Sequence, residues 1–205
     1  MSIKNFLEKL APQRTLGPPL TFTVFDVIKA LETFAESGSI GRGSLSKKLE
    51  LGEGATRTLI SRLTKAQLIV TTRSGCTLTK KGEGLWKQVK SIIPHKLRIE
   101  NNELTFAAYT MAVLVKNRAE TVKKGLEQRD AAVKAGASGT TTLIYRDGKM
   151  VLPTISSDIS TDYPKAFHQI MHLMNPMEND VVIVSCGATL KDAEYGALAA
   201  AWTLL

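Results

Sequence analysis

The sequence predicts an α+β protein of two domains, a helix-rich first half and a second half in which strands and helices alternate. Two observations support this prediction. The apolar residues of the first half recur mainly at the helical spacing of three and four, whereas the second half contains short β-branched runs typical of buried strands. The excess of positive over negative charge also lies entirely in the first half. Residues 1–102 contain 17 Lys and Arg against 8 Asp and Glu, whereas residues 103–205 contain 10 against 11.

Length and composition exclude several protein classes. A chain of 205 residues fits one large domain or two small ones. Hydrophobic residues at 43% and charged residues at 22% are typical of a globular chain, and no apolar run approaches the roughly 18–20 residues of a membrane span. Lys4, Glu8 and Lys9 interrupt the apolar start, which excludes a secretory signal. The two cysteines form neither a disulfide framework nor a zinc cluster, so we expect a cytoplasmic protein.

The first half is predicted to contain an arm and a helical domain. Residues 1–20 form the amphipathic arm, with a helix over residues 3–10. The domain of residues 21–93 begins with a helix that Thr23 caps. Its later elements are predicted as a helix over 45–49 capped by Ser44, a helix over 54–67, strands over 68–72 and 76–78 around a basic turn at 73–75, and a helix over 80–92 capped by Thr79.

This order of elements predicts a DNA-binding fold. A tight turn between the second and third helices, followed by a two-stranded hairpin, is typical of a winged helix-turn-helix, and the third helix is then the recognition candidate. The segments LSKKLELGEGATRTLISRLTKAQLI and RSGCTLTKKGEGL resemble those of prokaryotic transcription regulators with this fold. The resemblance covers residues 22–92 and implies duplex DNA as a partner.

The second half is predicted to be a small α/β sandwich-like domain of order βαββαβα. Residues 94–102 are polar and are interpreted as a linker, and the domain occupies residues 103–205. Its elements are predicted as a strand over 104–116, a helix over 126–135, a hairpin of 140–145 and 149–153 around an Asp-Gly turn, a helix over 163–174, a strand over 181–186 and a helix over 190–205.

Two segments of the second half also resemble a known family. EQRDAAVKAGASGTTTLIYRDGKMVLP and NDVVIVSCGATLKDAEYGALAAAWTLL are similar to the C-terminal domain, of unknown function, of an archaeal family whose first domain is a winged helix. The resemblance implies a transcription regulator, and it implies no known ligand or catalytic residue.

The predicted recognition helix has a polar face that suits DNA. Arginines donate paired hydrogen bonds to guanine, hydroxyls suit several base edges, and small residues let a helix lie deep in the groove. We expect the base-facing residues to be Ala55, Arg57, Thr58, Ser61, Arg62 and Lys65. We expect the hairpin Arg73 to enter the minor groove or to contact phosphate. The lysines expected to contact phosphate are Lys47, Lys48, Lys80 and Lys81. The alternative is a solvated basic face on a winged helix that binds protein.

A candidate ligand site follows the last predicted strand. Gly187 and Thr189 belong to a small polar turn that opens a helix, whose free N–H groups favour an anion. Arg129 interrupts a predicted apolar helix face, and Ser138 lies in a second small turn. That apolar face is predicted to consist of Val122, Leu126 and Val133. We expect a small anionic effector to bind to Arg129, Ser138, Gly187 and Thr189. Ordinary turn chemistry, with Arg129 and Asp130 as structural charges, is the alternative.

The sequence contains no convincing metal or catalytic site. His168 and His172 lie four residues apart on a predicted helix without a third ligand, so we expect no metal site. No Cys–His pair or phosphate-binding loop can be identified, so we expect neither a cofactor nor catalysis; an enzyme on the second domain is the weakest alternative. The nearby methionines, Met171, Met174 and Met177, are interpreted as core residues. We expect a homodimer that associates through the arm or the Ala-rich last helix.

Overall fold

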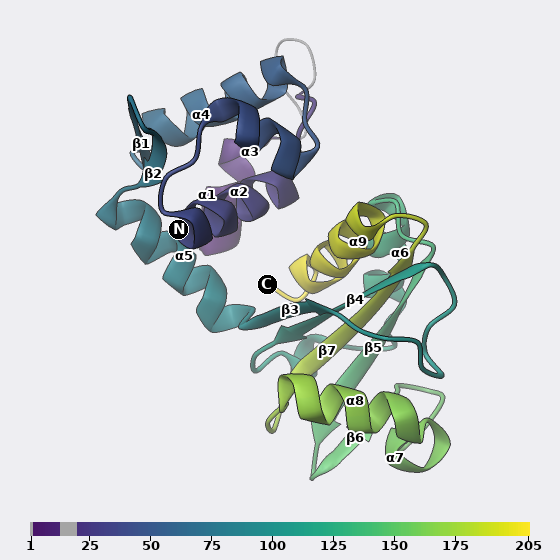
Figure 1. The fold of residues 1–205 in the computed structure, drawn as a ribbon. Helices are drawn as coiled ribbons and strands as arrows, with labels where there is room; N and C mark the ends of the chain where they lie inside the picture. Colours follow the sequence, from purple (N-terminus) through teal and green to yellow (C-terminus); the bar gives the residue numbers. More distant parts are fainter. Residues whose placement is uncertain (1, 13–19) are drawn as a thin grey trace. The chain divides into compact units, whose positions relative to one another are not determined.

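A computed structural model describes residues 2–12 and 20–205 of the chain (Figure 1). The fold is α+β, with two separate sheets. The chain divides into two compact units, Met1–Val89 and Lys90–Leu205, which are described in turn. Over the described residues, no helix combines the length and the apolar character that crossing a membrane requires.

The first unit contains four helices, a hairpin and most of a fifth helix, in the order that the sequence predicts. These elements are α1 (Ile3–Leu10), α2 (Val24–Ser37), α3 (Arg42–Leu49), α4 (Glu53–Lys65), β1 (Ile69–Thr72), β2 (Gly75–Leu78) and α5 (Lys80–Ile92), which continues beyond the unit boundary. The core is formed by fully buried side chains that include Leu31, Phe34, Leu45, Leu59 and Leu63.

Side-chain caps explain where two of these helices begin. The Thr23 hydroxyl accepts a hydrogen bond from the Phe25 N–H, and the Asp26 carboxylate accepts one from the Thr23 N–H at 2.7 Å, so the predicted cap of α2 is confirmed. The Thr79 hydroxyl accepts a hydrogen bond from the Gly82 N–H, as predicted for α5. The prediction for α3 is wrong. That helix begins at Arg42, with Gly41 as N-cap, instead of after Ser44.

Two glycines allow the hairpin to lie close to its neighbours. Gly75 has a φ of +129°, and a Cβ there would lie 2.7 Å from the carbonyl carbon of Ile40. Ile40 and Cys76 exchange two backbone hydrogen bonds, of 3.1 and 2.9 Å, so Ile40 extends the two-stranded sheet by one bridge. At the other end, a Cβ on Gly82 would lie 2.1 Å from the carbonyl oxygen of Leu68. The hairpin is therefore held at its turn and at its base.

Most apolar residues of the two helices predicted to form the dimer interface are buried within the chain. On α1, Leu7 and Leu10 are 0% and 8% exposed. On the last helix, every residue from Ala193 to Trp202 is buried. Most apolar side chains of these two helices pack inside the chain, whereas Ile3 and Phe6 of α1 are half-buried and Leu190 of α9 is 44% exposed. The remainder of the predicted arm, residues 13–19, lies outside the described residues.

The second unit is built on a five-stranded antiparallel sheet of order β3-β4-β7-β5-β6. The strands are β3 (His95–Arg98), β4 (Tyr109–Val115), β5 (Gly139–Arg146), β6 (Lys149–Val151) and β7 (Val181–Gly187). The helices are η1 (Ala119–Thr121), α6 (Leu126–Lys134), α7 (Ile159–Asp162), α8 (Pro164–Met174) and α9 (Leu190–Trp202). The predicted βαββαβα order is present, with β3, η1 and α7 as additions.

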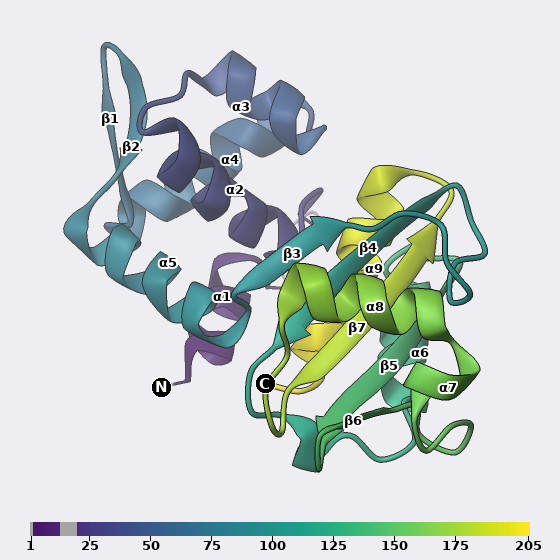
Figure 2. The same cartoon turned by 60° about the horizontal axis from the view of Figure 1, so that its bottom comes forward.

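Helices cover both faces of this sheet. Figures 1 and 2 show α8 on one face and α6 with α9 on the other. On the α8 face, Leu114, Leu143 and Val182 pack with Ile170 and Met174. On the other face, the small residues of α9 allow a close approach, since a Cβ on Gly196 would lie 2.6 Å from the Ser185 hydroxyl. β4 and β7 are consequently buried on both sides, which is why their sequences are apolar without alternation.

The segment interpreted as a linker contains an edge strand. β3 lies within residues 94–102 and pairs with β4 in register from His95 with Leu114 to Arg98 with Met111. Lys96 forms an ion pair with Glu194 of α9, and both side chains are largely buried. Ile99, just beyond the strand, is 4% exposed. An edge strand pairs with a neighbour on one side only, and it therefore tolerates polar residues. In the sequence, such a polar segment cannot be distinguished from a linker.

The prediction that Leu126 and Val133 of α6 face the core is wrong. Leu126 and Val133 are 50% and 51% exposed, whereas Gln128 and Ala132 are buried. Small and polar residues of α6 therefore contact the sheet, and the charges of Arg129 and Asp130 remain in solvent, where they pair at 3.3 Å. Among the methionines, Met174 is buried as expected, but Met177 is 63% exposed.

Candidate nucleic-acid interface

One side of α4 is exposed and polar. The helix packs Thr56, Leu59 and Leu63 into the core of the first unit. The opposite side carries exposed residues that recur at three- and four-residue spacing, namely Gly54, Arg57, Thr58, Ser61 and Lys65. The Thr58 hydroxyl donates to the Gly54 carbonyl at 3.0 Å, which orients it along the helix while its oxygen can still accept. This side presents donors and hydroxyls over about three helical turns.

Two predicted base-facing residues lie at the edge of this side. Ala55 and Arg62 are half-buried. The Arg62 guanidinium donates to the carbonyl of Leu10 at the end of α1, at 3.3 Å. Arg62 thus connects two helices of the first unit, and the exposed side of α4 is centred on Ser61 and Arg57 instead.

The four predicted phosphate-contacting lysines have different environments. Lys47 and Lys80 are exposed at the end of α3 and the start of α5. Lys48 is exposed and donates to the Ser37 hydroxyl at 3.3 Å. Lys81 donates to the Ala66 carbonyl at 2.8 Å, and its ammonium lies 5.8 Å from the Phe6 ring centroid. Lys81 therefore satisfies the carbonyl end of α4, where a cation also interacts favourably with the helix dipole.

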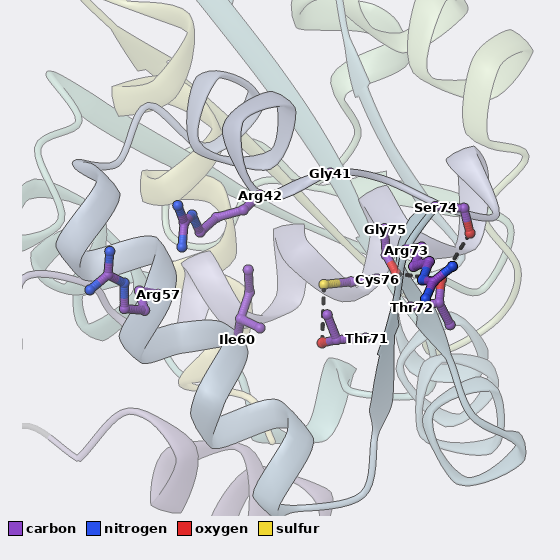
Figure 3. A pocket seen from close by; sticks show the side chains of 10 residues that line it. All are labelled: Gly41, Arg42, Arg57, Ile60, Thr71, Thr72, Arg73, Ser74, Gly75 and Cys76. Carbon is purple, nitrogen blue, oxygen red and sulfur yellow. Dashed lines mark hydrogen bonds between the residues drawn. The ribbon is translucent and has the colours of Figure 1, made fainter.

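An open hollow of about 340 Å³ lies between α3, α4 and the hairpin. Three arginines from these three elements line it, Arg42, Arg57 and Arg73. Figure 3 shows Arg42 and Arg57 on one side of Ile60 and Arg73 on the other, with Cys76 and Thr71 between them. No pattern in the sequence assigns Arg42 to the site. The sequence predicts that α3 begins after Ser44, which would place Arg42 in the connection before the helix, whereas the structure begins α3 at Arg42.

The three arginines of the hollow have no charged partner of their own in the described part of the chain. Within residues 2–12 and 20–205, none of Arg42, Arg57 and Arg73 forms an ion pair or a side-chain hydrogen bond. Residues 40–90 contain 11 Lys and Arg against 3 Asp and Glu. A concave surface with unpaired charge of one sign concentrates the field of those charges and attracts the opposite sign.

The predicted ligand site of the second unit is occupied by its own side chains. Thr189 is the N-cap of α9, where its hydroxyl accepts from the Asp192 N–H at 3.1 Å and donates to the Asp192 carboxylate at 2.7 Å. A Cβ on Gly187 would lie 2.5 Å from the Ala193 nitrogen. The Asp192 carboxylate already supplies a negative charge to the helix start, which accounts for this turn by ordinary capping.

The other two predicted ligand residues, Ser138 and Arg129, are exposed. The Ser138 N–H donates to the Cys186 carbonyl at 2.8 Å, which brings Ser138 beside Gly187. Arg129 is exposed on α6 and pairs with Asp130. The structure therefore brings Ser138, Gly187 and Thr189 into one neighbourhood around Asp192, a residue whose charge opposes an anionic ligand.

Two carboxyl groups with a lowered pKa are helix caps. Burial raises the pKa of Glu103, but hydrogen bonds from its own N–H and those of Ala166 and Lys165 lower it by more. The pKa of Asp158 is lowered chiefly by the Ser160 N–H and hydroxyl. Each carboxylate accepts hydrogen bonds from backbone N–H groups at a helix start, which accounts for the lowered pKa by capping.

No metal centre is evident in the part of the chain that the structure describes. His168 and His172 are exposed on α8. Among the described residues, no group of three or more His, Cys, Asp and Glu side chains could hold an ion. The two cysteines, Cys76 and Cys186, are free and buried, one in each unit.

Comparisons with known proteins cover both units. Residues 23–84 match the model of the PH0730-like N-terminal domain, and residues 106–204 match a domain of unknown function, DUF4443. A solved structure, the hypothetical protein PH0730 from Pyrococcus horikoshii OT3, is similar with a TM-score of 0.72 and 28% sequence identity over 89% of this chain and 92% of that one. No curated protein matches. The chain is thus similar in both its halves to an archaeal two-domain protein, and neither domain description names an activity or a ligand.

Proposed function

We propose that the first unit is a winged helix-turn-helix that binds duplex DNA, and that the chain is a transcription regulator. In this proposal α3 and α4 form the helix-turn-helix, α4 is the recognition helix, and the β1–β2 hairpin is the wing. The observation that carries the proposal is the exposed polar side of α4, with Arg57, Ser61 and Lys65 beside an arginine-lined hollow.

The composition of that exposed side supports base recognition. An arginine such as Arg57 can donate two hydrogen bonds to guanine, and the hydroxyls of Thr58 and Ser61 can donate to or accept from several base edges. Gly54 allows a close approach near the N-terminal end of α4, which is the end that contacts bases in helix-turn-helix proteins. In this proposal Lys47, Lys48 and Lys80 contact phosphates and fix the position of α4 in the groove.

The second unit contributes to the regulator by self-association. A homodimer would contact two half-sites of an operator, as is common for this class of DNA-binding fold. Leu7 and Leu10 of α1 and residues 193–202 of α9 are buried, so we place the association surface elsewhere on the second unit. We assign no effector site to this unit, because Asp192 occupies the helix start that suggested one.

The test is binding of a fluorescent duplex of mixed sequence, measured by anisotropy at several salt concentrations. We expect the logarithm of the association constant to fall linearly with the logarithm of salt concentration, with a slope of roughly −0.9 for each phosphate contacted. Absence of measurable binding at low salt would reject DNA as the partner and favour the alternative, a winged helix that docks protein.

A further inference from the structure

We propose that the hollow between α3, α4 and the hairpin is a binding site for a sugar phosphate. Arg42 and Arg73 hold the phosphate, the charge of Arg57 adds to the positive potential of the rim, and the apolar floor contacts the sugar. A DNA strand and a free phosphorylated sugar present the same chemical group. For the DNA source, the inference rests on the proposed function; for the free source it does not.

Unpaired positive charge surrounds the hollow, with Arg42 and Arg57 on one side of Ile60 and Arg73 on the other (Figure 3). The three arginines come from the start of α3, the body of α4 and the hairpin turn, and all three line one hollow. Their guanidinium groups have no acidic partner among the described residues. Guanidinium is planar, remains charged and matches phosphate oxygens with paired N–H donors. Three such groups around one opening favour a phosphate over a carboxylate or a neutral ligand.

The start of α3 also lines the hollow, and no side chain of the described residues caps it. Gly41 is the N-cap and has no side chain to accept the first backbone N–H groups of the helix. Gly41 and Arg42 both belong to the lining. Uncapped N–H groups at a helix start bind anions. This start is joined to the hairpin by the Ile40–Cys76 bridge, two positions before Arg42, so the donors of α3 and of the turn are held together.

The floor of the hollow is less polar than its rim. Ile60 is half-buried, and Cys76 is 3% exposed with its sulfur 3.5 Å from the Thr71 hydroxyl. Between them and the arginines there is room for more than one phosphate group, since about 340 Å³ is at the lower end of small-ligand pockets. An apolar floor under a cationic rim fits the carbon face of a pentose attached to the phosphate.

The first experiment uses the whole chain of 205 residues and ribose 5-phosphate as the probe. Amide chemical shifts are recorded during titration, with ribose and with sodium chloride of equal ionic strength as controls. We expect ribose 5-phosphate alone to move the amides of residues 41–43 and 73–76. Arg42→Gln and Arg73→Gln should weaken this binding at least tenfold. Lys87→Gln removes one exposed charge of α5 and should leave the binding unchanged.

The second experiment measures DNA binding of the same variants against salt. If a DNA strand fills the hollow, Arg42→Gln reduces the magnitude of the salt slope by about 1, and Lys87→Gln does not. Weaker ribose 5-phosphate binding by the arginine variants supports a site for a free sugar phosphate. A smaller salt slope of Arg42→Gln supports a site for a DNA strand. If neither probe distinguishes the arginine variants from Lys87→Gln, the proposal is wrong. If wild-type protein ignores DNA but ribose 5-phosphate binds as expected, the proposed function fails while the sugar-phosphate site stands.

Discussion

Arg57 and Arg62 lie five positions apart on α4, and the structure gives them different environments. The Arg57 side chain is exposed and lines the hollow, whereas Arg62 is half-buried and bonded to the Leu10 carbonyl. The sequence predicted equal roles for the two, because helical spacing alone shows which side a residue is on and not which neighbour reaches it. The difference gives a paired test.

We predict that Arg57→Ala weakens duplex DNA binding by about 1–3 kcal/mol and leaves the melting temperature unchanged. Arg62→Ala should lower the stability of the first unit by about 1 kcal/mol, because a hydrogen bond from a charged donor is lost. Anisotropy titrations and thermal melts of both variants check this. Equal effects of the two substitutions on DNA affinity, with equal melting temperatures, would contradict the distinction.

A second residue-scale prediction concerns buried hydroxyls in the second unit. The Thr142 and Ser185 hydroxyls lie on the face of the sheet that α6 and α9 cover. Both are buried, and neither has a hydrogen-bond partner among the residues that the structure describes. A buried polar group without a partner costs stability, so we predict that Thr142→Val raises the free energy of unfolding by about 1 kcal/mol.

Thr110→Val is the matched control. The Thr110 hydroxyl is equally buried but contacts the Cys186 sulfur at 3.5 Å. That variant should not be stabilised. Denaturant unfolding measures both, and destabilisation by Thr142→Val would show that an internal hydrogen-bond partner, such as a buried water molecule, had been lost.

At the scale of elements, local signals in the sequence predicted where most helices and strands lie. Thr23 and Thr79 identified two helix starts because a capping hydroxyl acts within three residues. The start of α3 was missed because Gly41 caps it without a side chain, so no cap signal exists. The strand β3 was missed because its pairing with β4 and the Lys96–Glu194 ion pair both join residues distant in sequence.

A test at this scale compares two glycines of α5. A Cβ on Gly82 would lie 2.1 Å from the Leu68 carbonyl oxygen, whereas a Cβ on Gly84 meets nothing within 4 Å. We predict that Gly82→Ala destabilises the first unit by about 1–3 kcal/mol through overpacking. Gly84→Ala should stabilise it by about 0.5–1 kcal/mol, since alanine favours the helix. Thermal unfolding of the two variants should shift in opposite directions; a shared direction would contradict the packing of Gly82 on the Leu68 carbonyl.

At the scale of the whole molecule, the boundary between the units decides which fragments fold. The sequence predicted that residues 103–205 form a domain, but the second unit is Lys90–Leu205 and contains β3 as its edge strand. We predict that a fragment of residues 90–205 unfolds cooperatively with the stability of a folded domain. A fragment of residues 103–205 should be less stable and more prone to aggregate, because β4 becomes an exposed edge and the Lys96–Glu194 pair is lost.

Circular dichroism melts and sedimentation of the two fragments provide the measurement. Equal melting temperatures would show that β3 contributes nothing to the second unit. The same fragments test the proposed DNA binding, since residues 1–102 carry a net charge of +9, whereas residues 103–205 carry −1 and residues 90–205 carry +1. Neither fragment of the second half should bind duplex DNA, because it lacks both the charge and the exposed side of α4.

The sequence by itself determined the α+β class, the order of elements in the first unit, the concentration of positive charge there and the polar side of α4 that includes Arg57. Each of these depends on composition or on spacing within one element. The tertiary structure alone decided that Arg42 joins Arg57 and Arg73 around one hollow and that Arg62 holds α1. It also decided that Lys96 belongs to a sheet, and that α6 turns Leu126 toward solvent. These outcomes depend on contacts between residues far apart in the chain, whose energies no local pattern encodes.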